Sequence, residues 1–198
     1  RSVLAQLVKD ISDAKPAVIG FDVVFSEPSN FVERSDLSAR PASVNEATWE
    51  NVQRTLRLQD DALADVILAS DRVVLGYFFE DIDVPSDRRS SAVRESRTVP
   101  GEAQSGVSLS SYNMVRGQVH QGGKVPIAYR VRSNLKEFSK AARGAGYFDV
   151  IPDAGDGYIR RIPLVIHYNT DMTLPLSLAM LRLYRPDAPF SIQVEPYG

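Results

Sequence analysis

An apolar run near the N-terminus constrains the fold more than any other feature of the sequence. Residues 17–25 read AVIGFDVVF, a nearly continuous apolar stretch rich in valine, and the polar or helix-breaking residues Ser26, Glu27 and Pro28 follow it. A strand with one face in water alternates apolar and polar residues, whereas an unbroken run suits a strand that is covered on both faces. The sequence therefore predicts a parallel or mixed sheet flanked by helices.

Helix and strand patterns alternate along the rest of the chain. Between residues 2 and 14, apolar residues recur at helical spacing, and Val3, Leu7 and Ile11 lie on one stripe. We predict further strands at 72–79, 145–151, 158–168 and 190–194, and further helices at 46–56, 62–69, 134–143 (with Asn134 as its cap) and 174–184. The pattern indicates a single α/β domain with a central mixed or mostly parallel sheet of about five strands, helices on both faces, and long loop insertions at 26–60 and 80–130.

Composition excludes several classes of partner and site. The chain has 198 residues, and its 23 basic and 25 acidic residues give a formal net charge of −2, so it lacks the electrostatic footprint of a nucleic-acid binder. The absence of cysteine excludes disulfides, thiolate zinc sites and a cysteine nucleophile. No apolar run reaches the length of a transmembrane helix. The chain begins at Arg1 without a methionine, so we expect it to be a piece excised from a longer protein.

Three groups of motifs occur in an order that is typical of a known family. The first is AVIGFDVVFSEP at 17–28, the second pairs DDALA at 60–64 with VVLG at 73–76, and the third combines GYFD at 146–149, DGYIRRIP at 156–163 and LPLSLA at 174–179. Together they extend over most of the chain, which resembles the CHASE2 family of sensor modules in bacterial membrane receptors. Residues 81–126 match no part of the family's pattern.

The resemblance implies a location and a role for the domain. CHASE2 modules lie on the extracytoplasmic face of the cell membrane, so we expect transmembrane helices before Arg1 and after Gly198 to tether this domain there. The output domain would be cytoplasmic, either a histidine kinase, a nucleotide cyclase or a serine/threonine kinase. The domain itself is expected to be non-catalytic, to need no cofactor, to bind an unknown small molecule or ion, and to be able to form a homodimer.

Five charged residues are the candidates for a ligand site. Asp22 falls in the first predicted strand and Glu27 lies just beyond its end, where ligands of α/β sheets collect. Arg160 and Arg161 alternate along another predicted strand, so one of them would point inward and could clamp a carboxylate or phosphate. Asp22 or Asp149 could instead be its partner within the protein, since a buried carboxylate must be paired or hydrogen-bonded. A structural hydrogen bond is the alternative role for Asp22.

The sequence gives little support for a metal or catalytic centre. Its two histidines, His120 and His167, occur in no metal-binding spacing. Asp153 and Asp156 resemble part of a calcium loop, but the distal glutamate is absent. The sequence also lacks a nucleophile elbow and a phosphate-binding glycine-rich loop.

Three functional hypotheses remain open on this basis. The first is a ligand sensor whose pocket includes Asp22, Glu27 and Arg160. The second is a dimerisation or protein-docking module without a ligand, in which the apolar stripe of residues 2–14 contacts a partner. The third is a hydrolase that uses Asp22, Glu27 and a divalent metal.

Overall fold

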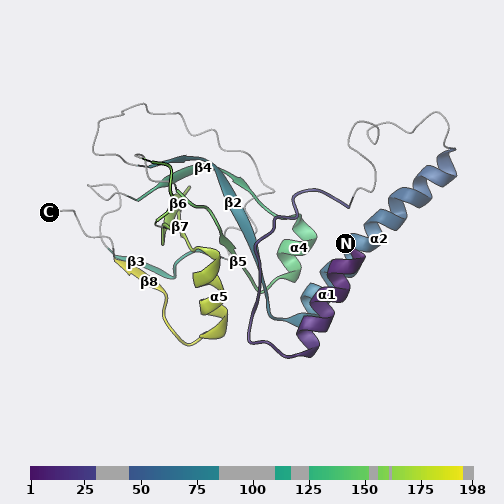
Figure 1. Ribbon diagram of the computed structural model, residues 1–198, viewed down its shortest axis with the longest axis horizontal. Coiled ribbons are helices and arrows are strands. Elements are labelled where there is room, and N and C mark those ends of the chain that lie inside the picture. The colour runs from purple at the N-terminus through teal and green to yellow at the C-terminus, as the bar shows by residue number, and fades with distance from the viewer. Residues whose placement is uncertain (30–44, 85–109, 117–124, 152–155, 161, 194–198) are drawn as a thin grey trace.

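The computed structural model describes residues 1–29, 45–84, 110–116, 125–151, 156–160 and 162–193, without the side chains of 52–58. Its elements, in chain order, are α1 (Ser2–Asp13), β1 (Ile19–Phe21), α2 (Glu46–Ser70), β2 (Val73–Asp83), β3 (Met114–Arg116), β4 (Ile127–Arg132), α4 (Lys136–Ala141), β5 (Gly144–Tyr147), β6 (Ile166–Tyr168), β7 (Asp171–Thr173), α5 (Leu176–Tyr184) and β8 (Ser191–Gln193). Figure 1 shows β2 and β5 running between α5 on one side and α1, α2 and α4 on the other.

β2 is the longest strand and has partners along both of its edges. Its first half pairs in parallel with β1, where Ile19 faces Val73, and with β5, where Gly144 faces Val74. Its second half pairs with β4 in the antiparallel direction. The sheet is mixed, as the sequence predicts, because parallel and antiparallel ladders share this one strand.

The strands beyond β2 close into a ring. From β2 the order runs through β4 and β6 to β7, with β6 parallel to β4 and antiparallel to β7. The chain after β7 then returns to β5, because the Tyr147 amide donates to the Leu174 carbonyl at 3.1 Å and Tyr147 forms a bridge with Pro175. The pairing of β5 with β2 completes the ring.

Two clusters of buried side chains stabilise the two halves of the molecule. The first packs α1, α2 and α4 against the sheet, and its buried members are Ala5, Val8, Ile19, Phe25, Leu63, Ile67, Val73, Leu75, Phe138 and Ala141. The second lies inside the ring of strands and consists of Tyr77, Phe79, Ala128, Ala145, Tyr147, Ile166 and Tyr168. Burial raises the pKa of Tyr77 and Tyr147, whose neutral hydroxyls bond to Ser110 Oγ at 2.6 Å and to the Pro163 carbonyl at 2.8 Å.

α5 covers the face of the sheet opposite α1, α2 and α4, and two glycines allow its close approach. A Cβ atom at Gly146 would lie 2.5 Å from the Cα of Leu176, at the start of α5. A Cβ atom at Gly20 would meet the sulfur of Met180 on the same helix. Helices therefore cover both faces of the sheet, which confirms that prediction.

Several predicted strands are shorter in the structure, and the one predicted at 145–151 ends at Tyr147. The difference is largest for two of them. The apolar run at 17–25 is a strand only at Ile19–Phe21. The pairing of β1 with β2 ends at Phe21. Beyond that point the same edge of β2 pairs with β4, so no partner is left there for residues 22–25. Of the strand predicted at 158–168, only Ile166–Tyr168 forms, since the described residues before it are mostly exposed and pair with no strand.

The predicted insertions contain regular structure. Two separate helices predicted at 46–56 and 62–69 form the single helix α2, capped by the Asn45 side chain, which accepts from the Thr48 amide at 2.8 Å. β3 and most of β4 form within the second insertion, where the sequence pattern predicts no strand, and β7 is a further strand that it does not predict. Of the predicted insertions, residues 30–44, 85–109 and 117–124 lie outside the described residues.

Candidate functional site

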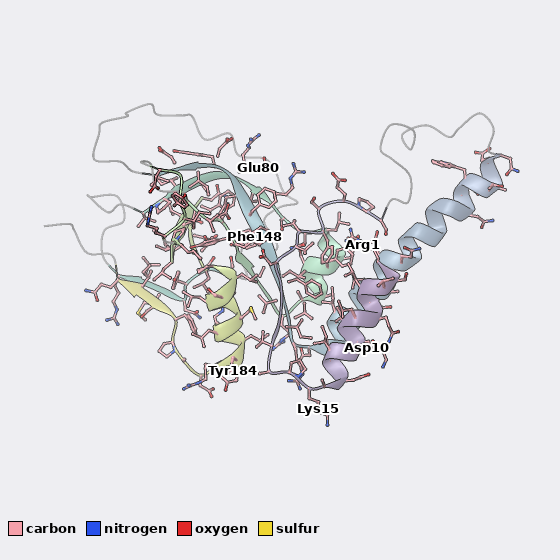
Figure 2. The ribbon with its side chains drawn as sticks, viewed as in Figure 1. Arg1, Asp10, Lys15, Glu80, Phe148 and Tyr184 are labelled. Carbon is pink, nitrogen blue, oxygen red and sulfur yellow. The ribbon has the colours of Figure 1, made fainter. Side chains whose placement is uncertain are left out.

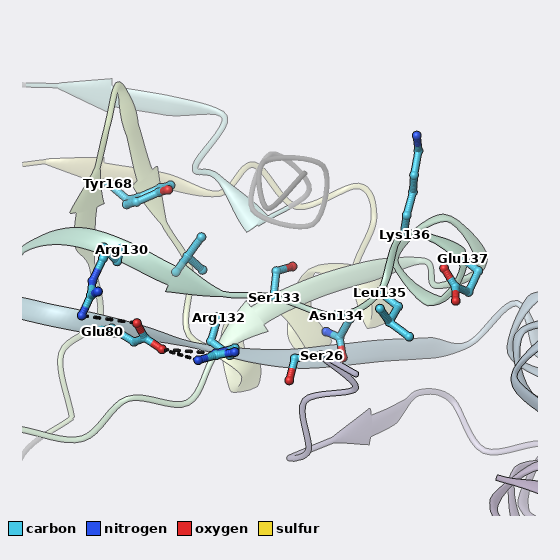
Figure 3. Close-up of a pocket in the computed structure, with 11 residues that line it drawn as sticks. Ser26, Glu80, Arg130, Arg132, Ser133, Asn134, Leu135, Lys136, Glu137 and Tyr168 are labelled. Carbon is cyan, nitrogen blue, oxygen red and sulfur yellow. Dashed lines mark hydrogen bonds and ion pairs between the residues drawn. The ribbon is translucent and has the colours of Figure 1, made fainter. Parts of the chain in front are cut away.

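A groove opens along β4 and brings together segments that are far apart in the sequence. Its volume is about 490 Å³, which falls within the range of pockets that hold small molecules. Figure 3 shows its lining, which comes from β2, β4, β6, the start of α4 and the segment after β1: Ser26, Glu80, Arg130, Val131, Arg132, Ser133, Asn134, Leu135, Lys136, Glu137 and Tyr168.

Ion pairs between β4 and β2 occupy one end of the groove. Arg130 and Arg132, two residues apart on β4, both bind Glu80 of β2, with nitrogen–oxygen distances of 3.4 Å and 3.1 Å. Arg130 also binds Asp81 at 2.9 Å. Lys136 lies at the other end, and none of the residues that the structure describes forms an ion pair with it. The lining thus offers three cations and two carboxylates.

Asn134 connects the groove to β2 and to the segment that follows β1. Its side-chain oxygen accepts from the Phe25 amide and its side-chain nitrogen donates to the Gly76 carbonyl, both at 2.8 Å and both buried. The Leu135 amide donates to the Phe25 carbonyl at 2.7 Å. The sequence predicts Asn134 as a helix cap, but the N-cap of α4 is Leu135, and the asparagine side chain binds Phe25 in the segment after β1 and Gly76 on β2 instead.

Arg1 connects the same segment to the start of α1. Its guanidinium binds the Asp60 carboxylate at 3.0 Å and donates to the Glu27 carbonyl at 2.7 Å. It also stacks 4.6 Å from the centre of the Phe25 ring, and Figure 2 shows it beside α4. The Ser29 amide donates to the other oxygen of Asp60 at 2.7 Å. Residues 25–29, which we call the linking segment, therefore contact the groove through Ser26 and the start of α1 through Glu27.

The structure separates the five candidate residues chosen from the sequence. Asp22 follows the end of β1 and is exposed, so its predicted position within a buried strand is wrong. Glu27 is part of the linking segment. Arg160 is exposed and binds Asp156 through two hydrogen bonds of 2.7 and 2.9 Å. The pairing of one of the two arginines with Asp22 or Asp149 stays a prediction, because Arg161 lies outside the described residues.

The prediction that Arg160 and Arg161 alternate along a strand is also wrong. Residues 156–160 form no strand, because they find no partner ladder among the described residues. Arg161 itself and Asp153 lie outside the described residues.

Asp149 caps the second half of β2. Both of its carboxylate oxygens accept from the Phe79 amide, at 3.0 and 3.1 Å. Burial raises the pKa of Asp149 to about 6, and the bond from Phe79 opposes that rise without cancelling it. The carboxylate therefore changes charge in the mildly acidic range, while it is bonded to the β2 residue that precedes Glu80.

Replacing Asp149 with asparagine should remove a pH dependence of stability. The pKa of Asp149 is about 6 in the folded chain and has its usual value of 3.8 in the unfolded chain, so the native state binds the proton more tightly and stability falls as the pH rises from 3.8 to about 6. Urea denaturation above and below pH 6 should show Asp149→Asn to be the more stable protein at neutral pH, with the difference closing as the pH falls. The exposed Asp61→Asn serves as a control that should follow the wild type. Parallel pH profiles for Asp149→Asn and the wild type would contradict the assignment.

Sequence reasoning did not select the charged residues of the groove. Glu80, Arg130 and Arg132 lie at the borders of the segment that showed no clear periodicity. The alternation Tyr129-Arg130-Val131-Arg132 is the signal that could have found them, since residues two apart on a strand share one face.

A comparison with known families identifies the chain. The family model of the CHASE2 domain matches residues 1–195. The chain belongs to the CHASE2 family. CHASE2 domains are extracytoplasmic sensory domains of signalling receptors, and they are generally non-catalytic. No curated protein and no solved structure matches the chain.

Several motif residues of this CHASE2 domain have structural roles. Asp60, which begins the second motif group, is the buried partner of Arg1. Gly146 provides the space for α5, and Asp149 caps β2. Among the described helices, none has the length and apolar character needed to cross a membrane.

Proposed function

We propose that this CHASE2 domain senses a small molecule or ion outside the cytoplasm and regulates a cytoplasmic kinase or nucleotide cyclase of the same receptor. The linking segment is the observation that carries the proposal, because it contacts the groove through Ser26 and the start of α1 through Glu27. A ligand that binds the groove more tightly in one of two positions of this segment increases the population of that position. The start of α1 follows, since Arg1 is bonded to the segment.

The candidate residues chosen from the sequence form part of the same proposal. Glu27 lies next to Ser26 in the linking segment, and Asp22 precedes that segment. Asp149 is bonded to Phe79, the neighbour of Glu80. We assign direct ligand contact to the groove residues, and to Glu27 and Asp149 an influence on the position of those residues.

A receptor chimera tests this function. The chain is inserted between transmembrane helices ahead of a histidine kinase whose output drives a reporter gene. Reporter activity should change with the composition of the external medium, and Asp60→Asn should abolish the change, because Arg1 loses its charged partner while the groove residues are unaltered. Asp61→Asn, an exposed neighbour, should respond like the parent. A reporter that stays constant in every medium, in cells that display the folded chimera, would refute the proposal.

An exposed stripe on α1 favours a second candidate function, self-association. Val3, Leu7 and Ile11 remain 80%, 47% and 39% exposed, although Ala5 and Val8 of the same helix are buried against the core. Side chains of both signs flank the stripe, including the Lys9–Asp13 ion pair at 2.7 Å. A surface with both charges can pair with itself about a twofold axis. The occupant that we propose for the stripe is therefore a second copy of this chain.

Polar substitution of the stripe should weaken this self-association without unfolding the chain. Val3→Gln combined with Leu7→Gln should raise the dissociation constant about tenfold or more, because it removes apolar surface from the interface. Sedimentation velocity over a concentration series measures the effect. The matched control is Leu181→Gln on α5, where the leucine is 44% exposed. A chain that sediments as a monomer at all concentrations, or a double variant that associates like the wild type, would refute the second candidate.

A further inference from the structure

We propose that the groove binds a small organic acid whose carboxylate displaces Glu80 from Arg132 and Arg130. The inference deepens the proposed sensing function and rests on it. It assigns the ligand class from the side chains that line the groove.

Glu80 itself marks where an oxyanion binds in the groove. One of its carboxylate oxygens lies 3.1 and 3.2 Å from two nitrogens of Arg132, and the other lies 3.4 Å from Arg130. In Figure 3 both arginines of β4 reach toward this carboxylate on β2. Two nitrogens of the Arg132 guanidinium thus converge on a single oxygen, and the same two donors are available to the carboxylate of an organic acid.

Because these side chains are partly exposed, replacing Glu80 by a ligand carboxylate costs little free energy. The side chains of Arg130 and Arg132 are each 48% exposed, and that of Glu80 is 28% exposed. Ion pairs at such positions contribute little to stability, because water screens them. Arg130 also keeps Asp81 as a partner at 2.9 Å when Glu80 moves away.

The remaining lining favours an organic acid over a bare inorganic ion. Val131 and Leu135 provide apolar surface, and Ser26, Ser133 and Tyr168 bring hydroxyl groups. The volume of about 490 Å³ is far larger than an inorganic ion requires. Lys136 supplies a cation at the far end of the groove, which suits a second acidic group on the ligand.

Calorimetric titration of the chain with malate, succinate, inorganic phosphate and the neutral polyol glycerol tests the inference. Both organic acids should bind, phosphate should bind with lower affinity, and glycerol should give no binding heat. Arg132→Gln should weaken malate binding by about tenfold or more, since it removes the two-donor contact. Glu80→Gln should do the opposite and tighten it about two- to fivefold, because the internal competitor is lost. Arg143→Gln, which alters an exposed ion pair with Asp71 outside the groove, is the matched control and should bind like the wild type.

The opposite signs of the two groove variants separate a binding site from a structural ion pair. If both variants bind malate like the wild type, or if phosphate binds as tightly as malate, the inference is wrong. Absence of malate and succinate binding at millimolar concentration also refutes it. The proposed function is tested separately by the chimera. If the chimera responds to its medium but the chain binds no organic acid, the sensing function stands and the ligand class is wrong. If the chain binds organic acids but the chimera does not respond, the binding site stands and the sensing function is wrong.

Discussion

Gly146→Ala should lower the free energy of unfolding by about 3 kcal/mol, at the upper end of the usual cost of overpacking a core. The new Cβ would lie 2.5 Å from the Leu176 Cα, 2.7 Å from the Leu176 nitrogen and 2.9 Å from the Pro175 carbonyl carbon. All three atoms belong to the backbone at the start of α5, so no side-chain rotation can relieve the contact. The helix would have to move away from β5, and the pairing that closes the ring of strands lies at the same place.

Gly144→Ala is the matched control for this prediction. It lies on the same strand, on the same face, two residues earlier, and its Cβ would contact only the Val74 methyl groups at an ordinary 3.8 Å. We expect a change within about 1 kcal/mol, since alanine also restricts the unfolded chain. Urea denaturation of both variants provides the comparison. Equal losses of stability in the two proteins would show that the close approach of α5 is not the cause.

Asn134→Ala should cost about 2–5 kcal/mol of stability. The substitution leaves the Phe25 amide and the Gly76 carbonyl without their side-chain partner in a buried environment, and each unsatisfied group costs about 1–3 kcal/mol. Because the same asparagine holds the linking segment against the sheet, the variant should also expose residues 25–29 to hydrogen exchange.

The exposed Asn113→Ala controls for the loss of an asparagine as such, and should leave stability and exchange unchanged. A loss for Asn134→Ala below about 1 kcal/mol would mean that water replaces both bonds. The linking segment would then need another explanation for its position.

The parts of the fold that sequence patterns predict well are those that pack against the core. β2 and α5 lie close to their predicted positions, and β5 overlaps the first part of its predicted range, because continuous apolar runs and helical spacing reflect burial directly. β4 was missed for the opposite reason: its arginines face the groove and its ladder is only half covered. Residues 158–165 misled the prediction, because Tyr158, Ile159 and Leu164 are apolar yet exposed.

The candidate site could be predicted only in part, because distant contacts create it. In the sequence, Asp60 resembles a polar residue that precedes a helix. In the structure it lies within α2 and is buried beside its ion-pair partner Arg1, 59 residues away. Likewise, Asn134 resembles a helix cap in sequence and becomes a connector only when Phe25 and Gly76 are beside it. Local spacing carries no information about such partners.

The closed ring of strands sets the order in which this extracytoplasmic domain can fold. The hydrogen bond of the Phe25 amide forms only when the side chain of Asn134, 109 residues later, is present. The ring of strands cannot close before Leu174 is present. A chain that crosses a membrane N-terminus first thus exposes β2 while its partners β4 and β5 are still on the other side. Unpaired strand edges of this kind invite aggregation, and distant pairings form slowly, in about milliseconds to seconds. The yield of folded receptor should therefore depend on how quickly export of the C-terminal third follows that of the first strands.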